Sequence, residues 1–106
     1  MRLRLTACLL FGASLAVPGA SAAPADGRTL AEAQCARCHD VGAGPVTQAK
    51  EGPAFADVGK MPSTTELSLK VFLRSSHRNM PNLILSADEI DALAAYILEL
   101  GGKGRS

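Results

Sequence analysis

The sequence predicts an all-α fold. An aspartate precedes a run of helix formers at 26–34, and capping boxes of the Ser/Thr-x-x-Glu type begin at 63 and 86. Apolar residues recur at helical spacing after the last of these signals, whereas no pair of strand-like segments flanks a tight turn. A chain of 106 residues is long enough for one domain built from these helices.

The first 22 residues have the organisation of a secretory signal peptide. A basic head precedes an apolar run over 5–17 that is too short to span a bilayer, and small residues at 20–22 form a cleavage site. We expect cleavage of 1–22, together with Cys8, and a single domain over 23–106. Its destination is an oxidising compartment outside the cytoplasm.

The remaining residues have a nearly balanced charge and few large core formers. Without Arg2 and Arg4 the net charge falls from +1 to about −1, which argues against nucleic-acid binding. There is no tryptophan, and the aromatic residues of 23–106 are Phe55, Phe72 and Tyr96. Domains of this size often depend on a cofactor to complete the core.

Three helices and one irregular segment are expected in order. The first helix covers 26–34, and the segment over 40–62 is irregular because glycine and proline interrupt it without an apolar period. The capping box Ser63-Thr64-Thr65-Glu66 starts a mostly apolar helix that ends near Ser75. The capping box at 86–89 starts the last helix, whose apolar stripe runs to a stop at Gly101.

The pentapeptide Cys35-Ala36-Arg37-Cys38-His39 is the strongest functional signal in the chain. Two thiols at this spacing, followed at once by an imidazole, are typical of a c-type haem attachment site. Cys35 and Cys38 would form thioether bonds to the two vinyl groups of one haem c. His39 would be the proximal iron ligand.

Other interpretations of these residues are open. A redox-active Cys-x-x-Cys needs a βαβ context that the sequence lacks. A zinc site would have to use Cys35, Cys38, His39 and His77, and the adjacent Cys38 and His39 cannot easily face one tetrahedral ion. A plain disulfide suits the compartment. None of the three needs a histidine directly after the second cysteine, so the haem site is favoured.

Several motifs follow one another along residues 23–106: Gly27, Leu30, the pentapeptide at 35–39, Gly52-Pro53, Met80-Pro81 and Leu93-Ala94-Ala95-Tyr96. In this order they resemble the small class I c-type cytochromes of the bacterial periplasmic type. The resemblance implies the cytochrome c fold, in which the N-terminal and C-terminal helices cross near Gly27 and Tyr96. The middle helix and loops would wrap around one covalently bound haem, and Ala31 stands where an aromatic residue is usual.

The resemblance also implies a partner for the proximal histidine. The carbonyl of Pro53 would accept a hydrogen bond from His39, and a metal-bound imidazole is steadied by such a bond. Pro45, which also follows a glycine, is the alternative. It is closer to His39 in sequence and has a tighter path, so Pro53 is favoured.

Met61, His77 and Met80 are the candidates for the distal iron ligand. Each methionine precedes a proline, which holds the preceding residue extended. In the resembled family the ligand methionine lies between the middle and last helices, and Met80 has that place. His77 could replace it and lower the potential, but we favour a role in which His77 orders the Met80 segment by hydrogen bonding.

Iron held by His39 and Met80 has no vacancy for a substrate, and the thioether favours ferrous iron. We therefore expect a periplasmic one-electron carrier rather than an enzyme, with a donor dehydrogenase and an acceptor oxidase or other cytochrome as partners. The alternatives are a haem-based catalyst or gas sensor with a displaceable sixth ligand, and a small haem subunit of a dehydrogenase or oxidase complex. A monomer or small subunit is expected, without nucleic acid or stable membrane insertion.

Three arginines are expected to border the haem edge through which class I cytochromes pass electrons: Arg37, Arg74 and Arg78. They would form a positive rim that guides an acidic face on the partner. The alternative is that they are solvated charges balancing a near-neutral surface.

Overall fold

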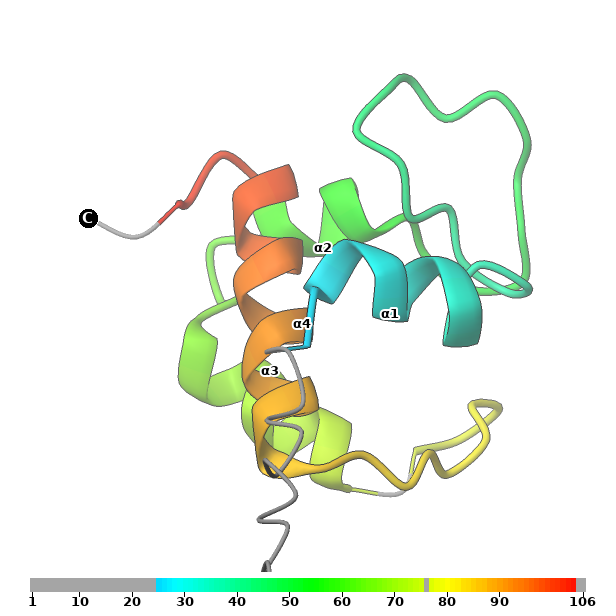
Figure 1. The fold of residues 1–106 in the computed structure, drawn as a ribbon. Coiled ribbons are helices and arrows are strands. Elements are labelled where there is room, and N and C mark those ends of the chain that lie inside the picture. Colours follow the sequence, from blue (N-terminus) through cyan, green and yellow to red (C-terminus); the bar gives the residue numbers. More distant parts are fainter. Residues whose placement is uncertain (1–24, 76, 105–106) are drawn as a thin grey trace, which may run out of the picture.

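The computed structural model describes residues 25–75 and 77–104, and these residues form four helices joined by loops (Figure 1). No β-strand occurs in them, which confirms the all-α class. The expected signal peptide at 1–22 and its Cys8 lie outside the described residues. The helices are α1 (Gly27–Gln34), α2 (Phe55–Lys60), α3 (Glu66–Arg74) and α4 (Ala87–Leu100).

Helix α4 is the centre of the fold, and each of the other three helices packs against it (Figure 1). Its predicted apolar stripe is the buried side, with Ile90, Leu93, Ala94 and Ile97 all at most 3% exposed. The Ser86 side chain accepts from the Glu89 amide and the Glu89 carboxylate accepts from the Ser86 amide, as the capping box predicts. Burial of the stripe provides the main apolar stabilisation of the helix.

Helices α1 and α4 approach closely at Gly27. A Cβ atom there would collide with the backbone carbonyl of Ala92 and the Cβ of Tyr96, so only glycine fits without a shift. One turn later Ala31 is completely buried, and its small side chain leaves room for the close approach. The Tyr96 hydroxyl donates to the Val41 carbonyl at 2.6 Å. The expected crossing near Gly27 and Tyr96 is therefore confirmed.

Helix α2 corrects the expectation of an irregular segment over 40–62. It is too short to display an apolar period, but it buries Phe55 and Gly59 against the rest of the fold. A Cβ at Gly59 would collide with the Ile97 carbonyl and with Gly101. Gly101 therefore ends α4 at a point where two backbones touch, and Gly102 carries the left-handed conformation (φ 74°).

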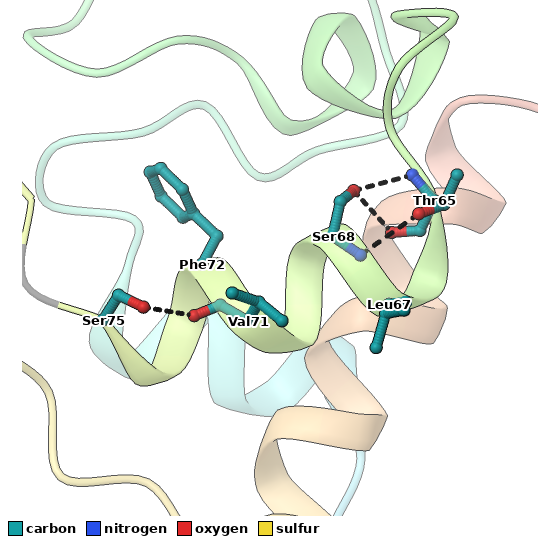
Figure 2. Close-up of a pocket in the computed structure, with 6 residues that line it drawn as sticks. All are labelled: Thr65, Leu67, Ser68, Val71, Phe72 and Ser75. Atoms are coloured by element: carbon teal, nitrogen blue, oxygen red, sulfur yellow. Dashed lines mark hydrogen bonds between the residues drawn. The ribbon is translucent and has the colours of Figure 1, made fainter.

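The start of α3 differs from the capping box predicted over Ser63-Thr64-Thr65-Glu66. The structure places the N-cap at Thr65, whose hydroxyl accepts from the Ser68 amide at 3.1 Å, and the Ser68 hydroxyl accepts from the Thr65 amide at 2.9 Å (Figure 2). The prediction was wrong because the chain is still in a turn at Thr64, whose amide donates to the Met61 carbonyl at 3.0 Å, and because Glu66 pairs with Lys70 instead. Lys70 also reaches Asp91 at 3.0 Å and so links α3 to α4.

Within residues 25–75 and 77–104, no helix has both the length and the apolar character to cross a bilayer.

Candidate haem site

The pentapeptide at 35–39 forms the turn that ends α1. The Cys35 amide donates to the Ala31 carbonyl at 2.9 Å, and the His39 amide donates to the Cys35 carbonyl at 2.9 Å. These bonds continue the helical path, so the two thiols and the imidazole are presented from one short, ordered turn. Cys35 is buried, Cys38 is half-buried, and both thiols are free.

The surroundings of Cys35 and Cys38 do not favour the alternative interpretations. Burial raises the pKa of the Cys35 thiol, whereas redox-active cysteines have a lowered pKa that exposes a thiolate. Among the residues that the structure describes, no group of three or more His, Cys, Asp or Glu side chains could hold a metal ion. A zinc site therefore lacks its ligand set in this part of the chain.

The ring of His39 is enclosed by residues 52–55. Its Nδ1 atom lies 2.7 Å from the carbonyl oxygen of Pro53, and a Cβ at Gly52 would collide with the ring. The ring of Phe55 lies 5.2 Å away between centroids, at an angle of 48°. Because a carbonyl can only accept, Nδ1 carries the proton and Nε2 keeps the lone pair that a metal needs.

Backbone contacts fix the enclosing segment against the turn. The Gly52 amide donates to the Cys38 carbonyl at 2.7 Å, and the Phe55 amide donates to the Asp40 carbonyl at 2.9 Å. The ammonium group of Lys50 donates to the carbonyls of the turn as well. Lys50 and Phe55 were missed in the sequence, since no spacing marks a loop lysine and one aromatic residue shows no period.

Met80 lies in a tight turn between α3 and α4. His77 and Met80 form an antiparallel backbone bridge, and Asn79 between them has the left-handed φ of 65° that asparagine tolerates better than most residues. Met80 is half-buried and lines a cavity of about 230 Å³. Arg74, His77, Pro81 and Leu83 line the same cavity.

His77 is held by stacking. Its ring lies on that of Phe72 with the centroids 3.4 Å apart and the planes at 20°. This stack connects the Met80 turn to α3, and the backbone bridge to Met80 holds His77 from the other side of the turn. Met61 lies elsewhere, at the end of α2, and is 45% exposed.

Large apolar side chains along α3 reach the surface, and Phe72 among them contacts the Met80 turn through His77. Leu67, Val71 and Phe72 are 71%, 57% and 51% exposed, and they line a shallow cavity of about 420 Å³ (Figure 2). The other lining residues are Thr65, Ser68 and Ser75. Exposed apolar patches of this kind occur at protein–protein contacts and in ligand-binding grooves.

The four-helix arrangement around α4 and the turn at 35–39 are the fold and motif of a c-type cytochrome domain. Residues 22–97 match the family described as cytochrome C oxidase, cbb3-type, subunit III, and the chain belongs to this family. Comparison with curated proteins and with solved structures gives no significant match.

The side chains present fit the haem c that such a domain implies. The two thiols of the turn are free, and the Nε2 atom of His39 is the ring nitrogen left for iron. Met80 offers a thioether from the turn after α3. An imidazole nitrogen and a thioether sulfur are the axial donors used by electron-carrying haem proteins.

Proposed function

We propose that Cys35 and Cys38 bind one haem covalently through thioether bonds, with His39 and Met80 as axial ligands. On this proposal residues 23–106 act in the periplasm as a one-electron carrier between redox proteins, after removal of the signal peptide. The observation that carries the proposal is the turn at 35–39, where two free thiols accompany an imidazole whose Nδ1 is held by Pro53. When bound, the haem supplies a one-electron couple.

The residues around His39 prepare it for this role. The Pro53 carbonyl fixes the tautomer and the orientation of the ring and raises the basicity of Nε2. Gly52 allows the backbone to lie directly against the ring, and Phe55 packs on it from α2. The backbone bond from Gly52 to Cys38 then ties this enclosure to the attachment turn.

The turn around Met80 would position its thioether, the second proposed iron ligand. The stack between Phe72 and His77 secures the first residue of the turn on α3, and the left-handed Asn79 reverses the chain before Met80. Pro81 then restricts Met80 to an extended backbone. If His39 and Met80 both hold the iron, no position would be left for a substrate, which favours a carrier over an enzyme.

A second candidate function is a haem-bearing subunit of an oxidase complex. The family description names subunit III of a cbb3-type oxidase, and the exposed apolar side chains of α3 offer a surface for a neighbouring subunit. The two candidates differ in how the haem protein is recovered. A free carrier stays in periplasmic extract as a monomer, whereas a subunit co-purifies with detergent-solubilised oxidase.

Carbon monoxide tests whether the sixth position is closed. We expect the ferrous holo-protein to show no rapid uptake of carbon monoxide at neutral pH, because Met80 occupies the position. The oxidised protein should show the weak near-infrared methionine-to-iron charge-transfer band. Fast uptake would favour a gas sensor or haem-based catalyst, and a bis-histidine spectrum would assign the position to His77.

A further inference from the structure

Lys50 binds the attachment turn from outside. Its ammonium group donates to the Ala36 carbonyl at 2.5 Å and to the His39 carbonyl at 3.2 Å. These two carbonyls lie on either side of Cys38 in the sequence. One side chain from the loop before Gly52 therefore closes over the part of the turn that carries the second thiol and the imidazole.

Lys50 provides a positive charge near the C-terminal end of α1. The last carbonyls of a helix lack intrahelical partners and carry the negative end of the helix dipole, which a cation stabilises. The last turn of α1 contains no basic residue of its own. Lys50, from a distant part of the chain, binds the carbonyls of Ala36 and His39 in the turn that follows α1, and so places a cation near that end of the helix.

The charge of Lys50 is not cancelled by its partners. Arg28 is paired with Glu32, and Lys70 is paired with Glu66 and Asp91, whereas both partners of Lys50 are neutral carbonyls. The nearby Asp40 carboxylate accepts from the Gly42 amide at 3.0 Å. Among the described residues Lys50 therefore forms no ion pair, and its charge and that of Asp40 both stay beside the attachment turn.

We infer that Lys50 is a positioning residue of the haem site, which fixes the 35–39 turn and whose charge favours the reduced state of the haem. This inference rests on the proposed function. Ferrous haem carries one positive charge fewer than ferric haem, so a neighbouring cation stabilises it relative to the ferric form. For an exposed ammonium group we expect an effect of about two- to tenfold on the ferrous-to-ferric equilibrium.

The test compares reduction potentials of holo-proteins that carry single substitutions. Lys50→Met removes the charge and both contacts, and Lys50→Arg keeps the charge. Lys103→Met is the matched control, because Lys103 also donates to two backbone carbonyls, those of Met61 and Thr64, between α2 and α3. Hydrogen exchange at the amides of Cys38 and His39 reports the fixing of the turn separately.

Lys50→Met is expected to shift the equilibrium toward the ferric form by about two- to tenfold, where tenfold corresponds to 59 mV for one electron. Lys50→Arg and Lys103→Met should stay within about twofold of the wild type, and exchange in the turn should accelerate only in Lys50→Met. If Lys50→Met yields no holo-protein, Lys50→Gln takes its place.

A Lys50→Met potential equal to that of Lys103→Met, with unchanged exchange in the turn, would overturn the inference. The wild-type spectrum separates this outcome from failure of the proposed function. A wild type with covalent haem and the near-infrared band keeps the proposed function, whatever the variants do. A wild type without haem removes both.

Discussion

The Nδ1 atom of His39 and the carbonyl oxygen of Pro53 lie 2.7 Å apart, within hydrogen-bonding distance. The preceding residue, Gly52, lies against the same ring, at a place where any side chain would collide with it. One dipeptide therefore sets both the orientation of the imidazole and the space in which it sits. The geometry of the attachment turn depends on this dipeptide as much as on its own residues.

Gly52→Ala should destabilise the holo-protein by about 1–3 kcal/mol, because the new methyl group displaces the His39 ring and weakens its bond to Pro53. Chemical denaturation measures the loss. Gly44→Ala is the matched control, since a Cβ at Gly44 in the same loop meets no atom within 4 Å. If the two variants were equally stable, the prediction would be wrong, because the His39 ring would then have space for the added methyl group.

Tyr96→Phe should lower the free energy of unfolding by about 1 kcal/mol at neutral pH, because the Val41 carbonyl loses its donor. The difference should shrink above pH 10. Burial raises the pKa of Tyr96 above its ordinary value of 10.0, so the unfolded state ionises first as the pH rises. The stabilisation is thus complete below pH 10 and is lost as the pH rises through the folded-state pKa.

Urea denaturation of the wild type and Tyr96→Phe at pH 7 and pH 11 measures this effect. Taking the difference between the two proteins cancels the titration of every other group. The chain has one tyrosine, so a spectrophotometric titration assigns the ionisation without ambiguity. A difference that stays constant or grows between the two pH values would contradict the predicted direction.

Arg74→Glu and Arg78→Glu should each lower the second-order rate of electron transfer with the physiological partner, by roughly tenfold at low salt, and flatten its salt dependence. Both arginines are exposed, and Arg74 lines the cavity beside Met80. Stopped-flow kinetics at several ionic strengths gives the rates. Lys60→Glu, on α2 away from the Met80 turn (Figure 1), is the charge-matched control. Unchanged rates at low salt would favour a mainly apolar contact.

Local sequence signals predicted the first and last helices, α1 and α4, better than the two helices between them. Asp26 caps α1 and Ser86 caps α4 as expected, because a cap needs only neighbouring residues and an apolar stripe of sufficient length. Helix α2 was missed because it is too short to show a period, and the contacts that hold it, burial of Phe55 and the approach of Gly59 to Gly101, are tertiary. The start of α3 was misplaced because Ser63, Thr64 and Thr65 are all possible caps, and the turn that the Thr64 amide closes on the Met61 carbonyl leaves the cap to Thr65.

Some features of the candidate haem site could likewise be predicted from the sequence, and others could not. The turn at 35–39 is a contiguous motif, so its residues could be named from the sequence alone. The contact of His39 with Pro53 came from a family resemblance, since nothing local specifies which proline returns to the ring. Two other contacts could not be predicted: that of Lys50 with the turn at 35–39 and that of Phe72 with His77. Both depend on how a loop folds back, and loop conformation leaves no periodic signal in the sequence.

Covalent attachment of haem is the central claim, and the intact mass of the purified protein after extraction with acid acetone tests it most directly. Only haem held by thioether bonds survives this extraction. The account predicts a coloured protein whose mass is that of residues 23–106 plus one haem, and a colourless polypeptide from the Cys35→Ser/Cys38→Ser variant. A wild-type protein that loses its haem to the solvent, or that keeps only the mass of the polypeptide, would contradict it.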